Sequence, residues 1–205
     1  MRIITISREF GSGGRELGKR LAEVLGCAYY DREIITAIAQ AQELDENYVE
    51  RELDKHGWQS VPLTYRRSFT SNAVLQSPQI NLLLEQKRVI ESIGKAGKDC
   101  IIVGRNADVF LAEYNPFNIF VCADMETKVR RCMDRATDDE NLTQKEMEQN
   151  IRRIDRNRAR TREIITGSKW GVCETYHLTV NTNGWDIKDL VPAVADFANC
   201  WFRRI

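Results

Sequence analysis

The chain opens with the stretch that decides its fold, Ile3-Ile4-Thr5-Ile6-Ser7-Arg8-Glu9-Phe10-Gly11-Ser12-Gly13-Gly14-Arg15. Its β-branched residues predict a strand that ends near Ser7, and its closely spaced glycines predict a tight loop over residues 8–14. An apolar stripe then predicts a helix that begins near Gly14 and is capped by Gly26; the stripe consists of Leu17, Leu21, Val24 and Leu25. A strand, a glycine-rich loop and a helix N-terminus in this order predict a phosphate-binding loop.

The loop departs from the Walker A pattern Gly-x-x-x-x-Gly-Lys-[Ser/Thr], which can be laid on it in two frames. In the first frame Gly18-Lys19 supplies the Gly-Lys pair, but Lys19 falls inside the predicted helix. In the second frame Arg15 takes the lysine position, and we prefer it because the strand ends near Ser7 and leaves the loop at residues 8–14. A guanidinium can bind phosphate oxygens through two hydrogen bonds. A glycine-rich turn without a ligand is the alternative. The predicted ATP phosphate contacts are Gly11, Ser12, Gly13, Gly14, Arg15 and Glu16, and Ser12 or Glu16 is a candidate ligand of Mg²⁺.

Composition sets only broad limits on function. The 205 residues include 30 basic and 30 acidic side chains, so net charge does not steer the chain toward nucleic acid or anionic membranes. No apolar run approaches the about 20 residues that a membrane span needs, and Met1 and Arg2 lead into a strand without a signal peptide. We therefore expect a cytoplasmic protein with no membrane partner. The six cysteines are scattered, which makes a zinc site an unfavoured interpretation.

Strands and helices alternate along the rest of the chain. This order predicts a single three-layer α/β/α domain over residues 1–205 with a parallel sheet of about five strands. Residues 58–79 hold two prolines and several Ser and Thr, and predict an irregular loop. Further strands are expected at 28–30, 100–103, 118–122 and 178–180, and further helices at 32–42, 45–56, 80–96, 126–135 and 187–202.

Polar residues follow several of the predicted strands. Ligands of parallel sheets gather beyond the carboxyl ends of the strands, so Asp31, Arg105 and Asp124 are of interest. An arginine directly after a buried strand is unfavourable without a partner, which makes Arg105 a candidate anion ligand. A structural ion pair of Arg105 with Asp31 or Asp108 is the alternative. We interpret Asp124 as the N-cap of the helix that follows it.

Residues 152–162 contain six arginines around a single acid, Asp155. Before this segment, Thr143 and Glu146 predict a capping box, which would start a long helix that carries the arginines. We interpret residues 136–170 as an arginine-rich lid that closes over polyphosphate and excludes water. An exposed basic helix that binds RNA or another partner is the alternative, although the neutral chain and the lack of interleaved aromatic residues disfavour nucleic acid.

Taken together, these residues resemble the cytidylate kinase-like branch of the nucleoside monophosphate kinases, over nearly the whole chain. The resemblance implies a P-loop nucleotide kinase fold with a helical lid. It further implies ATP with Mg²⁺, and transfer of the γ-phosphoryl group to CMP, dCMP or a related small phosphate-bearing acceptor. The residues that carry it are 6–18, Tyr29-Tyr30-Asp31, Ile102-Val103-Gly104-Arg105, 155–162 and Gly167-Ser168-Lys169-Trp170-Gly171 with Tyr176 and Leu178.

The resemblance also implies roles for individual residues. It places residues 58–79 on the acceptor side, and the expected oligomeric state is a monomer or homodimer. Asn106 replaces an aspartate of the family motif, and the loop lacks the family's lysine and magnesium-binding hydroxyl. These departures leave open a nucleotide-binding regulatory protein of the same fold that has lost transfer. The implied acceptor-binding residues are Asp31, Arg105, Asn106, Asp155 and Arg158, and the implied catalytic residues are Arg15, Arg158, Arg156 and Arg160.

Overall fold

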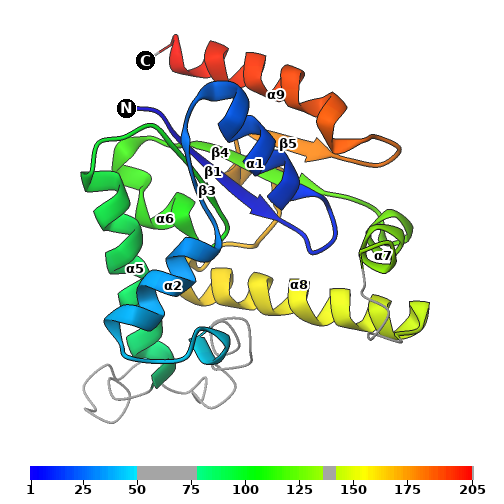
Figure 1. Cartoon of the computed structure of the whole chain (residues 1–205). Helices are drawn as coiled ribbons and strands as arrows, with labels where there is room; N and C mark the ends of the chain where they lie inside the picture. The colour runs from blue at the N-terminus through cyan, green and yellow to red at the C-terminus, as the bar shows by residue number, and fades with distance from the viewer. Residues whose placement is uncertain (50–77, 136–141, 205) are drawn as a thin grey trace.

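The computed structural model describes residues 1–49, 78–135 and 142–204, which fold around one five-stranded sheet (Figure 1). The strand order is β2-β3-β1-β4-β5, and every neighbouring pair is parallel. The first strand therefore lies at the centre, where both of its edges are paired. The strands are β1 (Ile3–Arg8), β2 (Ala28–Tyr30), β3 (Cys100–Val103), β4 (Phe117–Cys122) and β5 (Leu178–Asn181).

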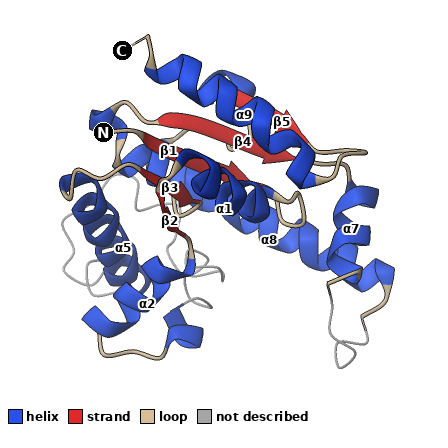
Figure 2. Cartoon of the chain, turned by 45° about the horizontal axis from the view of Figure 1, so that its top comes forward, coloured by secondary structure: helices blue, strands red, loops and turns tan. Residues whose placement is uncertain are grey.

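Helices cover both faces of the sheet (Figure 2). Short 3-10 turns at Ala112–Tyr114 and Cys173–Thr175 complete the connections. The helices are α1 (Gly14–Leu25), α2 (Arg32–Ala41), α5 (Pro78–Lys95), α6 (Ala107–Phe110), α7 (Met125–Met133), α8 (Gln144–Thr166) and α9 (Ile187–Phe202).

The alternation of side chains along the strands builds one apolar core on each face. Ile4 and Ile6 of β1 pack in one core with α1 and α9, whereas Ile3 packs in the other with α2, α5 and α6. Each of these three isoleucines is nearly fully buried. Two covered faces are what an all-parallel sheet requires, and the predicted three-layer α/β/α fold is confirmed.

Most predicted elements lie where the sequence placed them, with small differences at their ends. β1 continues to Arg8, beyond the predicted end near Ser7. Residues 46–49 of the helix predicted at 45–56 are helical, and its remainder lies outside the described residues. The loop predicted at 58–79 also lies outside them up to residue 77. Its last two residues belong to α5, which begins at Pro78, because the fixed φ of proline suits a first helical turn.

No helix in the described ranges is long and apolar enough to span a lipid bilayer.

Candidate active site

Residues 9–13 form the loop that joins β1 to α1 at the carboxyl edge of the sheet. Gly11 and Gly13 have φ angles of +77° and +84°, which residues with side chains rarely adopt. A Cβ on Gly11 would also lie 2.9 Å from Cys132 Sγ and 3.0 Å from the Lys128 carbonyl oxygen. The glycines therefore let α7 pack directly on the loop and let α1 begin at Gly14, as predicted.

Ser12 fixes the centre of this loop. It is fully buried, and its Oγ donates a hydrogen bond of 2.9 Å to the Glu9 carbonyl oxygen. Its own carbonyl oxygen accepts hydrogen bonds from Arg131 Nη1 at 3.1 Å and from Thr182 Oγ1 at 2.8 Å. The loop is thus fastened to α7 and to the residue that follows β5.

The N-terminus of α1 has the character of an anion site. Its N-cap is Gly13, so no side chain caps the helix. The first amide N–H groups of a helix lack intrahelical partners, and the helix dipole adds positive potential at the same end. A loop and helix start of this kind bind phosphate oxygens.

Asp31 brings two arginines together at the end of β2. Its side chain is only 7% exposed and forms an ion pair with Arg15 Nε. Arg8 Nη2 lies 3.7 Å from the same carboxylate. The Arg15 side chain is 56% exposed, so it covers the buried carboxylate from the solvent side. The predicted acceptor-binding acid and the predicted loop cation are therefore neighbours.

Arg8 is a site residue that sequence reasoning missed. Its side chain is 10% exposed and passes between the loop and the end of β3. A Cβ on Gly14 would lie 2.6 Å from Arg8 Cβ, and a Cβ on Gly104 would lie 2.6 Å from Arg8 Cζ. The signal was present, because an arginine that ends a buried apolar strand is the same pattern that singled out Arg105.

The electrostatic surroundings of Arg8 are dominated by other guanidinium groups. The pKa of Arg8 is lowered to about 9, mainly by burial and then by the charge of Arg158, with smaller lowering by Arg105 and Arg15, while Asp31 raises it. The side chain is still charged at neutral pH. Arg8 and Arg15 meet at the Asp31 carboxylate, whereas Arg158 lies 3.5 Å from the Asp155 carboxylate.

Arg105 and Asn106 lie in a strained turn after β3. Gly104, Arg105 and Asn106 have successive φ angles of +77°, +59° and +55°. Left-handed conformations are unfavourable for an arginine and need support from surrounding structure. Gln86 Nε2 donates a hydrogen bond of 2.9 Å to the Arg105 carbonyl oxygen. The turn keeps both predicted acceptor-binding residues at the edge that carries the loop.

Helix α8 presents one continuous face to the rest of the protein. The capping box of Thr143 and Glu146 starts it as predicted. Met147 and Ile151 are buried at its beginning. The same face then changes from apolar to charged, because helical spacing places Asp155, Arg158 and Arg162 in line with them.

Asp155 holds the loop from the α8 side. Its carboxylate accepts a hydrogen bond of 2.7 Å from the Phe10 backbone N–H and lies 3.3 Å from Lys128 Nζ. Lys128 also lies 3.1 Å from the Glu9 carboxylate. Burial raises the pKa of Asp155. Lys128 was not anticipated, since no local pattern marks a buried lysine on α7. An acceptor-binding role of Asp155 stays a prediction.

Arg158 is the α8 arginine that reaches the loop. Its Nη1 donates a hydrogen bond of 3.1 Å to the Arg8 carbonyl oxygen, and its Cζ lies 5.7 Å from the centre of the Phe10 ring. Arg156 and Arg160 are exposed on the same helix, and their catalytic role stays a prediction. The lid predicted over residues 136–170 includes residues 136–141, which lie outside the described ranges.

A buried ion pair anchors the other end of α8. Arg162 Nη1 donates to the Asp108 carboxylate of α6, and both side chains are under a tenth exposed. This carboxylate is the one that the sequence offered as an alternative partner of Arg105, and that pairing stays a prediction. Asp124 accepts a hydrogen bond of 2.7 Å from Thr127 N and caps α7, as predicted.

The two candidate magnesium ligands are already engaged. The Ser12 hydroxyl donates within the loop. The Glu16 carboxylate lies 3.0 Å from Arg20 Nε and 2.6 Å from Arg135 Nη2. Across the described ranges, no group of three or more His, Cys, Asp and Glu side chains could hold a metal ion.

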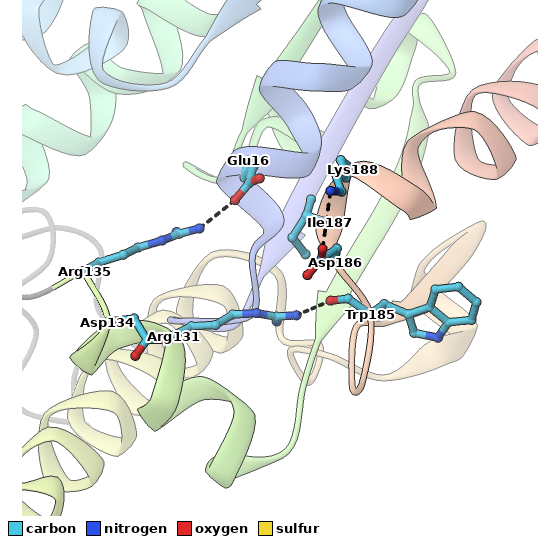
Figure 3. A pocket seen from close by; sticks show the side chains of 8 residues that line it. All are labelled: Glu16, Arg131, Asp134, Arg135, Trp185, Asp186, Ile187 and Lys188. Carbon is cyan, nitrogen blue, oxygen red and sulfur yellow. Dashed lines mark hydrogen bonds and ion pairs between the residues drawn. The ribbon is translucent and has the colours of Figure 1, made fainter.

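A cavity of about 320 Å³ lies beside the first turn of α1 (Figure 3). Arg131 crosses its base and donates hydrogen bonds of 2.9 Å to the carbonyl oxygens of Thr182 and Trp185. Trp185 is more than half exposed. The cavity is thus continuous with the loop through Glu16 and Arg131. Its lining comes from α1, α7 and the start of α9, with Glu16, Arg131, Asp134, Arg135, Trp185, Asp186, Ile187 and Lys188.

This geometry agrees with a family assignment. The model of the cytidylate kinase-like family matches residues 3–184. The chain belongs to the cytidylate kinase-like family. The family and the fold are those of kinases, which bind a nucleotide and a small acceptor, transfer a phosphoryl group between them and generally use ATP with Mg²⁺. No curated protein matches this sequence significantly.

Solved structures share the fold across nearly the whole chain. An uncharacterized protein from Eubacterium ventriosum is 23% identical with a TM-score of 0.69, and the match covers 97% of this chain and 99% of that chain. Shikimate kinase from Bacteroides thetaiotaomicron is 12% identical with a TM-score of 0.58, covering 97% and 98%. Shikimate kinase from Acinetobacter baumannii, in complex with shikimate, is 15% identical with a TM-score of 0.52, covering 96% and 92%. At these identities the likeness establishes the fold.

Proposed function

We propose that this protein is an ATP-dependent phosphotransferase whose acceptor is a small phosphate-bearing molecule, with CMP or dCMP as the leading candidates. One observation carries the proposal. Arg8, Arg15, Arg105 and Arg158 gather at the carboxyl edge of the sheet, where Asp31 lies against Arg8 and Arg15 and Asp155 lies against Arg158. Such a cluster of guanidinium groups beside a glycine-rich helix start is suited to polyphosphate.

The glycine loop and the first turn of α1 would bind the phosphates of ATP through backbone N–H groups. The nucleoside would occupy the 320 Å³ cavity beside the first turn of α1. The acceptor would bind on the opposite side of the loop, near Asp31, Arg105 and Asn106. Its phosphate oxygen attacks the γ-phosphorus, and the bond from that phosphorus to the bridging oxygen breaks to release ADP.

Catalysis would depend on charge and position. Phosphoryl transfer needs aligned reactants and stabilised oxygens more than covalent chemistry by the protein. Arg158 is the leading catalytic group, because it bridges α8 and the loop. Arg156 and Arg160 would contribute only in a conformation that turns their exposed side chains toward the nucleotide. Mg²⁺ accompanies ATP in this proposal and would be held mainly by phosphate oxygens and water.

A nucleotide-binding regulatory protein of the same fold is the second candidate. It is favoured by the engagement of Ser12 within the loop and of Glu16 with Arg20 and Arg135. Together with the absence of the Walker lysine, these contacts describe a loop that could bind ATP without turning it over.

An acceptor panel separates the two candidates. Purified protein would be incubated with ATP, Mg²⁺ and each of CMP, dCMP, UMP, AMP and shikimate, and ADP release would be followed by a coupled assay. We expect ADP release that depends on one acceptor. Binding of ATP by calorimetry without ADP release on any acceptor would favour the regulatory candidate.

Two arginines of α8 give a matched pair of variants. Arg158→Ala removes a group in contact with the loop, whereas Arg152→Ala removes one that pairs with Glu148 on the exposed face. A phosphotransferase loses turnover in the first variant and keeps it in the second. Equal loss in both would indicate that α8 acts only through helix stability.

A further inference from the structure

The strand and helix boundaries define a register of the Walker A pattern that differs from both sequence frames. The pattern spans eight residues between a strand and a helix. β1 ends at Arg8 and α1 begins at Gly14, so eight residues counted from the last residue of the strand run from Arg8 to Arg15, the second residue of the helix. In this register Gly13 is the second glycine, Arg8 replaces the first glycine, and Gly14 replaces the lysine.

Steric contacts explain why these two replacements occur together. A Cβ on Gly14 would lie 2.6 Å from Arg8 Cβ and 3.2 Å from Val121 Cβ. Real Cβ atoms do not approach another carbon this closely, so a side chain at position 8 requires a glycine at position 14. The loop can therefore receive its cation from the strand side or from the helix side, but not from both.

The side chain of Arg8 is directed toward the cationic edge of the site. It passes Gly104, whose Cβ would lie 2.6 Å from Arg8 Cζ, and its Nη2 remains 3.7 Å from the Asp31 carboxylate. That separation is longer than a close charge-assisted hydrogen bond. The neighbouring Arg158, Arg105 and Arg15 oppose its charge. Arg15 pairs with Asp31 and Arg158 lies 3.5 Å from Asp155, so Arg8 is the buried guanidinium whose nearest carboxylate is 3.7 Å away and engaged by another arginine. Such a cation would be stabilised by an anion.

We propose that Arg8 is the phosphate-binding cation of this loop, performing from the end of β1 the task that lysine performs from the start of the helix in a Walker A loop. Its guanidinium contacts the terminal phosphate of the bound nucleotide. Arg15 occupies the Ser/Thr position of the pattern and pairs with Asp31, so it belongs to the acceptor side. This inference rests on the proposed function and names the residue that holds the transferred group.

The test moves the cationic side chain from position 8 to position 14. The variants are Arg8→Gly, Arg8→Gln, Gly14→Lys and the double variant Arg8→Gly with Gly14→Lys, with Arg152→Gln as a control for the loss of an exposed arginine. Binding of inorganic tripolyphosphate and of ATP is measured by calorimetry, and folding by circular dichroism and thermal unfolding. Arg8→Gln keeps the buried chain length if Arg8→Gly does not fold.

We expect Arg8→Gly and Arg8→Gln to weaken tripolyphosphate binding by about 10- to 100-fold, the loss of one charge-assisted contact. Gly14→Lys alone destabilises the fold, because it introduces the clash with Arg8. The double variant regains most of the affinity, which a purely structural ion pair of Arg8 with Asp31 would not predict. Wild-type affinity in a folded Arg8→Gln variant, or no regain in a folded double variant, would overturn the inference.

The two proposals can fail separately. Tripolyphosphate binding is measured without an acceptor, so a protein that binds it through Arg8 but transfers nothing would retain this inference and lose the proposed function. A protein whose Arg8→Gln variant transfers phosphate with an unchanged KM for ATP would retain the function and lose the inference. Failure of the wild-type protein to bind either tripolyphosphate or ATP would overturn both.

Discussion

Two buried arginine–aspartate contacts in this protein differ in their charge balance. At the junction of α6 and α8, Arg162 faces Asp108, and both side chains are under a tenth exposed. At the carboxyl edge of the sheet, Asp31 faces Arg8 and Arg15, and Arg105 and Arg158 add to the positive charge. The first contact pairs one cation with one anion, whereas the second region brings four arginines beside two carboxylates, Asp31 and Asp155.

The difference separates a structural contact from a binding site. A paired buried charge gains little from a further ligand, and its removal mainly affects folding. An unbalanced cluster is unfavourable until an anion enters, so its residues should affect ligand binding and turnover more than stability. The comparison therefore predicts opposite effects for substitutions at the two places.

The largest effect on stability is expected from Asp108→Ala. Removing this carboxylate leaves Arg162 charged and buried, which should lower the free energy of unfolding by about 3–5 kcal/mol. Urea unfolding followed by circular dichroism measures it. The double variant Asp108→Leu with Arg162→Met should recover much of the loss, because it removes both charges. A single variant as stable as the wild type would mean that the pair does not anchor α8.

Arg158→Ala should give the largest effect on turnover. Loss of a group that stabilises the transferring phosphoryl should lower kcat by about 100- to 1,000-fold, with a smaller change in stability than Asp108→Ala causes. Steady-state kinetics with the acceptor identified by the panel measures it, and Arg152→Ala is the control. An unchanged kcat would remove Arg158 from the site and weaken the distinction between the two contacts.

Asp31→Asn should have a moderate effect, and it should strengthen anion binding where the loss of an arginine would weaken it. Loss of this carboxylate increases the positive charge of the cluster, so tripolyphosphate should bind about 3- to 10-fold more tightly at low salt. The gain should shrink as sodium chloride is raised, and acceptor-dependent turnover should fall. Calorimetry at two salt concentrations measures the gain, with the exposed Asp196→Asn as the control. Weaker binding would show that Asp31 organises the arginines more than it opposes them.

The smallest effect is the change in the free energy of unfolding with pH, which we expect through His177. Burial lowers the pKa of His177, whose Nδ1 accepts a hydrogen bond of 3.0 Å from Asn118 N. Because its pKa is lower in the folded protein than in the unfolded chain, the unfolded chain takes up the proton first on acidification. Stability should therefore be complete above about pH 6.5 and fall as the pH is lowered below it.

The urea midpoint at pH 7.5, 6.5 and 5.5 tests this pH dependence. The wild-type midpoint should fall toward pH 5.5, and the midpoint of His177→Gln should fall less. An equal fall in both proteins would assign the dependence to carboxyl groups elsewhere.

Local sequence patterns predicted the fold well. Strand and helix periods placed the elements of both cores, and the helical phase of Leu17 and Leu21 placed the start of α1 at Gly14. The strand-end argument brought Asp31 and Arg105 to one edge of the sheet. These inferences succeeded because each depends on spacing within one element or on the geometry of a parallel sheet.

Long-range contacts were beyond this reasoning. Lys128 and Glu9 are separated by 119 residues, and Arg162 and Asp108 by 54. No local pattern links such partners, and an arginine-rich helix does not reveal which of its arginines turn inward. Arg8 was missed for a different reason: the strand was expected to end near Ser7, which placed Arg8 in the loop and hid its position at a strand end.

Transfer of the γ-phosphoryl group of labelled ATP tests the central claim most directly. The wild-type protein, Arg158→Ala and Arg152→Ala would each be mixed with γ-labelled ATP, Mg²⁺ and the acceptor panel in a single turnover. The account predicts one labelled phosphorylated acceptor with the wild type and Arg152→Ala, and about 100-fold slower labelling with Arg158→Ala. The absence of any labelled acceptor from the panel, with ATP bound equally by all three proteins, would contradict it.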